Sequence, residues 1–206
     1  MFCLSVRRLQ SILDVCQVYA ESPGIIFNCS KTVCMTFKTK SAKSTVILIL
    51  SLGGQNVKSV NHYKYLWIQL DTELSDDKDI QRQLRYQHCA ARKLRASFSQ
   101  CSYAVRYVLF RSFSMSMYAS QLWCNFRNSC MQRLCVAYDF GYCAQYNLPW
   151  RASVSVHQVQ CNILTFEALL RKNLHLFLRR CRKSKNVWLR TFGAVRLFLF
   201  VLLFKH

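Results

Sequence analysis

The chain has 206 residues, with 29 Lys or Arg against 9 Asp or Glu, so its formal net charge at pH 7 is +20. A hydrophobic content of 52% allows a buried core and excludes a wholly disordered chain, and the length suits one large or two small domains. The first ten residues contain Arg7 and Arg8 and lack the apolar stretch of a signal peptide, so we expect an intracellular protein, nuclear or cytoplasmic.

The charge is distributed unevenly along the chain. Residues 1–79 hold 9 basic and 7 acidic side chains, whereas residues 80–206 hold 20 basic and 2 acidic ones, Asp139 and Glu167. Such a one-sided region repels itself unless an anionic partner is near. Nucleic acid is the commonest such partner and an anionic membrane surface is the next. The remaining alternative is a basic surface that only keeps the protein soluble.

The first third of the chain predicts one helix followed by short strands. Apolar side chains recur every three or four positions over residues 5–20, which predicts an amphipathic helix that ends at Pro23-Gly24. Gly53-Gly54 suits a hairpin turn because glycine tolerates a positive φ. Strands are predicted around this turn at residues 25–27, 33–37, 46–50, 57–60 and 63–68.

After Leu74 the apolar period changes from two to about 3.6, which indicates a switch to helix. Ser75 is expected to cap the first helix, and Asp76, Asp77 and Asp79 in its first turn suit the helix dipole. Its predicted buried stripe is Ile80, Leu84, Ala91, Leu94 and Phe98. Further helices are predicted over 102–119, 127–146 and 165–182, with Thr165 as the cap of the last and a break at Leu148-Pro149.

These elements predict an α+β fold with a small β-containing region at 1–72, a mainly α-helical bundle at 73–185 and an apolar tail at 186–206. The apolar run from 187 to 204 is interrupted by Arg190 and Arg196. A spanning helix needs roughly 20 mostly apolar residues, and a central arginine costs about 3 kcal/mol on insertion scales. We therefore expect this tail to pack or to lie at an interface, with a membrane anchor as the alternative.

The sequence has twelve cysteines but no Cys-x-x-Cys. The closest groups are Cys29/Cys34 and Cys130/Cys135/Cys143, and the five histidines are scattered. Because these spacings do not match a zinc site, we expect reduced, mostly buried thiols and no metal, with a degenerate metal site as the alternative.

Several segments share an ordered likeness to one family. They are Leu9–Cys16, Phe27–Met35, Asn61–Ile68, Leu74–Ile80, Leu109–Phe113, Ser120–Trp123, Asn147–Ser153 and Thr165–Lys172. In this order they resemble the end of the palm, the primer-grip strand and the thumb and connection region of a non-LTR (LINE-type) retrotransposon reverse transcriptase. The resemblance covers most of residues 5–185 and implies a palm remnant followed by a thumb-like bundle.

The family's polymerase centre carries a Tyr-Ala-Asp-Asp motif and an earlier aspartate, which bind two magnesium ions. Here the Asp-Asp pair is Asp76-Asp77, at a helix start. We therefore expect a truncated and degenerate fragment of an RNA-directed DNA polymerase that is inactive alone. It should need no cofactor and no small-molecule substrate, and should bind at most RNA or DNA non-specifically. The alternatives are a basic membrane-associated protein with a C-terminal apolar segment, or a retroelement remnant with no selected function.

By the same resemblance, Lys31 is the catalytic candidate, since it matches a palm lysine beside the incoming triphosphate. Its alternative is a solvent-facing lysine in a turn. Tyr63, Lys64 and Tyr65 match the primer-grip strand. Strand alternation would place the two tyrosines on one face and Lys64 on the other, and the alternative is an amphipathic strand with packing tyrosines. The family has glycine where this chain has Trp67.

Basic side chains complete the candidate nucleic-acid-binding set. Arg82, Arg85 and Arg92 should share a face of the thumb-like helix, with Lys93 and Arg95 near its edges. A second basic stretch consists of Arg171, Lys172, Arg179, Arg180, Arg182 and Lys183. Contacts of this kind hold phosphates without reading sequence. The alternative for the thumb-like helix is a solvated helix face, and the alternative for the end of the second stretch is a nuclear-localisation patch.

Overall fold

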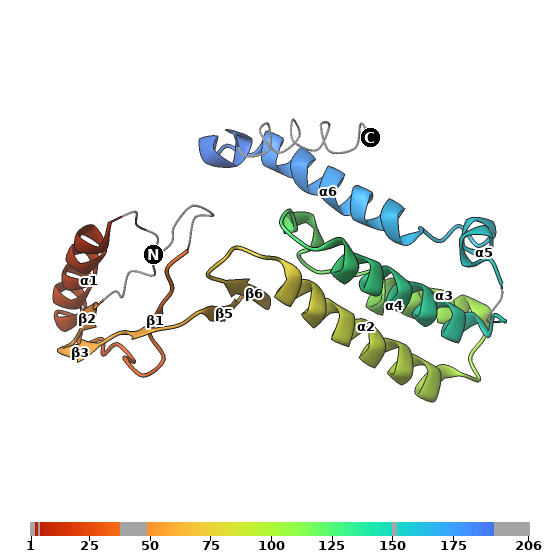
Figure 1. Ribbon diagram of the computed structural model, residues 1–206, viewed down its shortest axis with the longest axis horizontal. Helices are drawn as coiled ribbons and strands as arrows, with labels where there is room; N and C mark the ends of the chain where they lie inside the picture. The colour runs from red at the N-terminus through yellow and green to blue at the C-terminus, as the bar shows by residue number, and fades with distance from the viewer. Residues whose placement is uncertain (1–2, 4, 38–48, 150–151, 192–206) are drawn as a thin grey trace. The chain divides into compact units, whose positions relative to one another are not determined.

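The computed structural model describes residues 3, 5–37, 49–149 and 152–191 (Figure 1). It divides into two compact units, Met1–Lys78 and Asp79–His206. The first unit contains one helix and all the described strands, and the second is helical. The chain therefore has an α+β fold that is mostly helical, as predicted.

Helix α1 (Val6–Glu21) opens the first unit, and two glutamine side chains attach it to the following hairpin. The Gln10 amide bonds both main-chain groups of Ser51, donating to its carbonyl at 3.0 Å and accepting from its N–H at 2.9 Å. About two turns further along the helix, the Gln17 side-chain oxygen accepts from the Gly53 N–H at 2.9 Å. These amides satisfy main-chain groups that a neighbouring strand would otherwise pair.

Three two-stranded sheets make up the rest of this unit. Strands β2 (Ser51–Leu52) and β3 (Gln55–Asn56) form the hairpin predicted at Gly53-Gly54, where both glycines have positive φ. Strand β1 (Val33–Cys34) pairs in parallel with β4 (Lys58–Ser59). Strand β5 (His62–Tyr65) pairs antiparallel with β6 (Ile68–Asp71).

The structure corrects several strand predictions. Residues 25–27 form no strand, and the strands predicted at 33–37 and 57–60 shrink to two residues each, because a strand extends only as far as its partner backbone. Of the strand predicted at 46–50, residues 46–48 lie outside the described residues. The strand predicted at 63–68 is instead the β5–β6 hairpin, since Leu66 and Trp67 both adopt positive φ and reverse the chain.

The helical part of the chain begins with α2 (Asp77–Phe98), which Ser75 caps by accepting from the Asp77 N–H. It continues through α3 (Tyr103–Phe113), the short 3-10 helix η1 (Ser120–Leu122) and α4 (Asn128–Tyr146). It ends with α5 (Val154–Gln160) and α6 (Phe166–Lys183). The Thr165 hydroxyl accepts from the Ala168 N–H, which confirms the predicted cap of α6. The helix predicted at 102–119 stops at Phe113, and α5 was not predicted.

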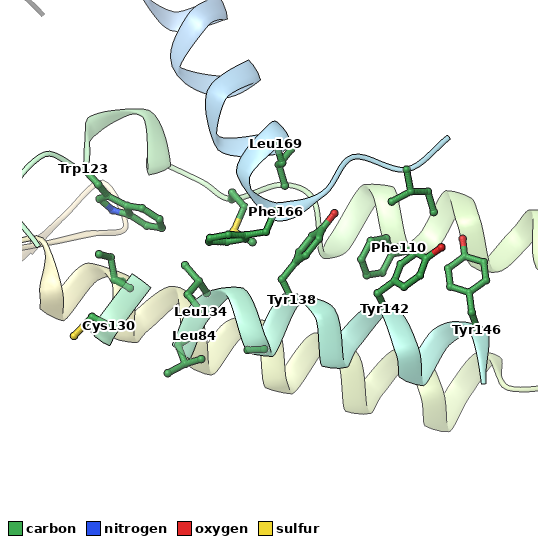
Figure 2. Packing of buried hydrophobic residues seen from close by; sticks show 14 residues of the cluster. Leu84, Phe110, Trp123, Cys130, Leu134, Tyr138, Tyr142, Tyr146, Phe166 and Leu169 are labelled. Atoms are coloured by element: carbon green, nitrogen blue, oxygen red, sulfur yellow. The ribbon is translucent and has the colours of Figure 1, made fainter. Parts of the chain in front are cut away.

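A row of side chains at every fourth position of α4 forms the centre of the core. Cys130, Leu134, Tyr138, Tyr142 and Tyr146 are all buried, and Figure 2 shows them in sequence along the helix. The rings of Tyr138 and Tyr142 each lie 5.4 Å from that of Phe110 on α3, centroid to centroid. From the other helices, Ile80, Leu84, Phe166 and Leu169 join this cluster.

Helix α2 contributes the stripe predicted for it. Ile80, Leu84, Ala91 and Leu94 are buried, and Phe98 is half-buried. At the crossing with α4, a Cβ on Gly141 would lie 3.5 Å from the Ala91 Cβ. Two small residues thus let the helices approach closely.

The prediction that the cysteines are mostly buried is wrong. Cys130 and Cys181 are buried, seven are half-buried, and Cys3, Cys89 and Cys124 are exposed. The apolar tail predicted from 187 is described as far as Thr191, and 192–206 lie outside the described residues. Within the described part, no helix is both long and apolar enough to cross a bilayer.

Candidate nucleic-acid interface

The β5–β6 hairpin carries the predicted primer-grip residues on a solvent-exposed surface. All four residues of β5 are exposed, and Tyr63, Tyr65 and Trp67 are 42%, 55% and 69% exposed. Tyr63 pairs with Leu70, and Tyr65 pairs with Ile68. The two tyrosines therefore do not pack into a core. Their exposed rings can stack on unpaired bases, an interaction worth about 1–3 kcal/mol per base.

Trp67 holds the neighbouring lysine on this hairpin. The Lys64 ammonium lies 3.8 Å from the centre of the Trp67 ring, within the range of a cation–π contact. Trp67 has a φ of +68° in the turn, the conformation that glycine adopts at least cost. The position at which the resemblance expects glycine is thus one whose backbone favours glycine, and the tryptophan adds an exposed ring and a partner for Lys64.

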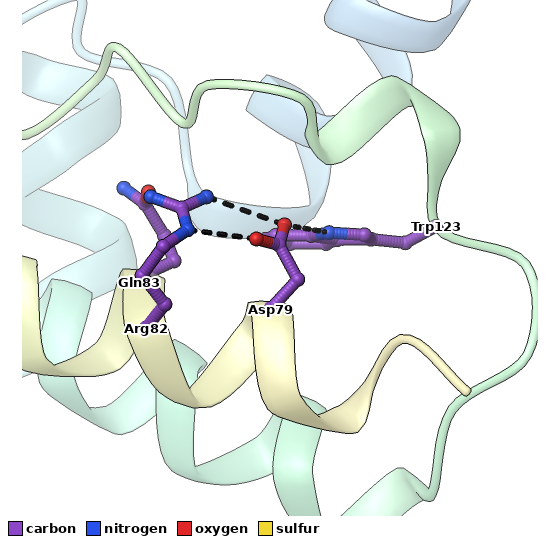
Figure 3. A network of polar contacts seen from close by, with 4 residues as sticks. All are labelled: Asp79, Arg82, Gln83 and Trp123. Atoms are coloured by element: carbon purple, nitrogen blue, oxygen red, sulfur yellow. Dashed lines mark hydrogen bonds and ion pairs between the residues drawn. The ribbon is translucent and has the colours of Figure 1, made fainter. Parts of the chain in front are cut away.

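On α2, Arg82 differs from the other predicted arginines because it is bound to Asp79, and Figure 3 shows this contact. The Arg82 guanidinium binds both carboxylate oxygens of Asp79, with Nε 2.7 Å from Oδ1 and Nη2 3.2 Å from Oδ2. Asp79 is buried, and its Oδ2 also accepts from the Trp123 indole N–H at 2.9 Å. Arg82 therefore serves the fold of the bundle, and its prediction as a phosphate-contacting residue gains no support from this geometry.

Three exposed arginines of α2 follow one face of the helix. Arg85, Arg92 and Arg95 lie seven and three residues apart, a spacing that keeps them on the same side of a helix. We call these three the α2 stripe. Lys93 is exposed as well, but one position round the helix from Arg92. Arg95 replaces Arg82 as a member of the face that the sequence predicted.

Helix α6 carries a second basic face, which we call the α6 stripe. Its members are exposed and fall within about a third of the helix circumference; they are Arg171, Lys172, Arg179, Arg182 and Lys183. The opposite side of the helix includes the buried Phe166 and Leu169. Basic residues in the last turn also suit the negative end of the helix dipole.

The carboxylates of the second unit occupy two places. Asp79 is paired in the interior, while Asp139 and Glu167 meet around Cys135, whose Sγ is 4.0 Å from Asp139 Oδ2 and 3.8 Å from Glu167 Oε1. Burial raises the pKa of Cys135 to about 11, and the two nearby carboxylates add to this rise. Burial, with a smaller contribution from Glu167, also raises the pKa of Asp139, against the opposing hydrogen bond from Gln158. Glu167 is exposed and lies four residues before Arg171, so it offsets part of the charge of the α6 stripe. The α2 stripe has no acidic residue beside it on the same helix after Asp79.

Lys31 lies in a turn between α1 and β1. Its side chain is exposed, and its main-chain N–H donates to Asn28 Oδ1 at 3.1 Å. No group of three or more His, Cys, Asp or Glu side chains in the described part of the chain is arranged to hold a metal ion. The described geometry thus gives Lys31 the setting of an ordinary turn lysine.

A thiol and an imidazole approach each other in the second unit without forming a nucleophilic pair. Cys161 Sγ lies within hydrogen-bond distance of both ring nitrogens of His157, 3.6 Å from Nδ1 and 4.0 Å from Nε2. His157 Nδ1 already shares a 2.7 Å hydrogen bond with the Tyr142 hydroxyl. An activated thiol needs a base directed at its proton. The His157 ring instead packs against Tyr142 and Tyr146 of the core, 5.7 Å from each ring, centroid to centroid.

Comparison with known proteins finds no relative: no protein-family model, no curated protein and no solved structure matches the chain. The likeness to reverse transcriptases accordingly rests on the sequence segments themselves.

Proposed function

We propose that the chain is a reverse-transcriptase-derived fragment that binds RNA or DNA without reading sequence and does not polymerise nucleotides on its own. The observation that carries this proposal is the excess of exposed basic side chains in the second unit. Its α2 and α6 stripes are exposed, while its carboxylates are buried or grouped around Cys135. Such surfaces release counterions from a phosphate backbone when they bind it.

Two kinds of contact would contribute. Guanidinium groups of the stripes bind phosphate oxygens, often through two parallel hydrogen bonds, and these contacts position the backbone without selecting a base. The exposed rings of Tyr63 and Tyr65 would stack on unpaired bases of single strands. The stripes should therefore set the salt dependence of binding, and the hairpin should set the preference for single strands over duplexes.

The test of the stripes is the dependence of affinity on salt, measured by fluorescence anisotropy on two unrelated duplexes. Each phosphate neutralised lowers the log–log slope by about 0.9, so replacing Arg85, Arg92 and Arg95 with glutamine should make it shallower by about two to three. The effect should be equal on both duplexes. Replacing Arg179, Arg182 and Lys183 with glutamine measures the α6 stripe in the same way.

The matched control removes the same charge elsewhere, by glutamine at Arg7, Arg8 and Lys31, all exposed in the first unit. If this control flattens the slope as much as the stripe variants do, the assignment to the stripes is wrong. If neither stripe variant alters the slope and both remain helical by circular dichroism, nucleic-acid binding by this chain should be abandoned.

The hairpin is tested by replacing Tyr63 and Tyr65 with threonine, which keeps strand propensity and removes the rings. Affinity for a single-stranded oligonucleotide should fall about tenfold for each ring that stacks, while duplex affinity should hardly change. Equal losses on single and double strands would contradict a stacking role.

Polymerase activity is tested separately, by primer extension on RNA and DNA templates with magnesium or manganese. We expect no template-dependent incorporation, because the family's two-metal mechanism requires carboxylates that match no segment of this sequence. Incorporation above that of a mock preparation would contradict the proposal.

A second candidate function, binding to an anionic membrane surface, is favoured by one observation. Beyond the basic end of α6, Val187, Trp188 and Leu189 are 61%, 84% and 45% exposed. An exposed tryptophan beside arginines and lysines is typical of interfacial attachment. Co-sedimentation with vesicles that contain phosphatidylserine, but not with neutral vesicles, would support it, and Trp188→Ala should then weaken binding.

A further inference from the structure

A polar pocket of about 260 Å³ lies between α6 and the segment that leads into η1. Asn173, Leu176, Phe177 and Arg180 line it from α6, at positions that share one face of the helix. We infer that this pocket receives a single nucleotide of a bound strand, with the base inside and its phosphate on Arg180. The inference rests on the proposed nucleic-acid binding and names a subsite for it.

The walls of the pocket are built by the fold. Met117 and Ala119 adopt positive φ and turn the chain after α3, and the buried Met117 forms part of the floor. Asn173 Nδ2 donates to Ser120 Oγ at 3.2 Å and so ties α6 to η1. A pocket held by a side-chain hydrogen bond across two elements is largely pre-formed, as ligand sites commonly are.

The lining matches the chemistry of a nucleotide. The amides of Gln121 and Asn173 carry the donors and acceptors that pair with base edges. Arg180 is exposed beside them and can bind phosphate. None of the described residues that line this pocket carries a carboxylate, which favours an anionic ligand.

The size of the pocket limits the ligand to one base. Pockets for drug-sized molecules occupy about 300–1,000 Å³, and this one lies just below that range. Arg180 lies about 60° around the helix from Lys183 of the α6 stripe, on the side that lines the pocket. A nucleic-acid strand whose phosphates follow the α6 stripe could therefore turn one nucleotide toward Arg180 and into the pocket.

The test is equilibrium dialysis of the full chain with each of AMP, GMP, CMP and UMP. At least one should bind, and Arg180→Gln should weaken it at least tenfold. Arg133→Gln on α4 is the matched control, since it removes the same charge from an exposed position outside the pocket and both stripes and should change mononucleotide affinity less than twofold. Gln121→Leu, which keeps the size of the side chain, should alter the preference among the four bases.

The outcomes separate this inference from the proposed function. Polymer binding with a steep salt slope but no mononucleotide binding would overturn the pocket and leave the stripes in place. Equal losses from Arg133→Gln and Arg180→Gln would also overturn it, because they would reflect total charge. An unchanged base preference in a folded Gln121→Leu variant would contradict base recognition in the pocket.

Discussion

Trp123 donates its indole N–H to the Asp79 carboxylate, with 2.9 Å between Nε1 and Oδ2, and so joins residues 44 positions apart. Both side chains are buried, and Arg82 binds the same carboxylate from the adjacent turn of α2. Three donors thus converge on one carboxylate. The first turn of α2 is thereby fixed to the segment that follows η1.

Asp79→Asn should lower the free energy of unfolding by about 1–3 kcal/mol. The Asp79 carboxylate offers two acceptor oxygens to Arg82 and Trp123, whereas the asparagine amide would offer one. Trp123→Phe should cost a similar amount, and the double variant should cost less than the sum, since both changes remove the same bond. Urea unfolding followed by circular dichroism measures these values. Trp188→Phe, at an exposed site, is the control and should be neutral; additive losses would argue against the Asp79–Trp123 bond.

In the β5–β6 turn, Trp67→Gly should leave the hairpin about 1 kcal/mol more stable than Trp67→Ala. Both changes remove the ring that contacts Lys64, but glycine alone relieves the positive φ at this position. Amide hydrogen exchange across residues 63–70, measured by NMR, should be slower in the glycine variant. Faster exchange in the glycine variant would mean that residue 67 does not occupy the left-handed region.

In the interior of α4, Gly141→Ala should raise the free energy of unfolding by about 0.5–1 kcal/mol. The added methyl would make an ordinary contact of 3.5 Å with Ala91, and alanine has the higher helix propensity. Gly54→Ala is the opposite case, because the space around it is open but its φ of +74° strains any side chain. Thermal unfolding should show a gain for the first variant and a loss for the second.

Cys135 should react with iodoacetamide at pH 8 far more slowly than the exposed Cys3, Cys89 and Cys124. Its pKa is raised to about 11 by burial and by two carboxylates, so little thiolate is present. Glu167→Gln removes one of these negative charges, lowers the pKa of Cys135 and should speed its alkylation. Peptide mass spectrometry of the native protein gives the rate at each site. A rate at Cys135 unaffected by Glu167→Gln would refute this electrostatic coupling.

The longest patterns in the sequence predicted the fold best. The helix over 5–20, the buried stripe of α2, the Gly53-Gly54 turn and the Thr165 cap all depend on local periodicity or on one residue's backbone preference. The β5–β6 turn was missed because Leu66 and Trp67 are residues that seldom adopt positive φ. Helix α5 was missed because seven residues are too few to establish a helical period.

The candidate interface was predicted less completely, for a different reason. Spacing alone places Arg82 near Arg85 and Arg92, but it cannot reveal that Trp123, far along the chain, draws Asp79 and Arg82 into a buried network. The pocket beside η1 was likewise absent from the prediction, since it depends on how α6 packs against a loop. The one local signal was the spacing of Asn173, Phe177 and Arg180, which marks a polar edge on an apolar face.

The strands of the first unit have a consequence for the behaviour of concentrated solutions. Each described sheet has two strands, so the outer edge of each strand has no neighbouring strand among the described residues. Open edges of this kind can pair with the edges of other molecules. Mutual repulsion of chains that carry +20 opposes such pairing, and salt shortens its range to about 10 Å at 0.1 M. Raising the ionic strength should therefore lower the solubility limit of the protein, and the precipitate should be rich in intermolecular β-structure.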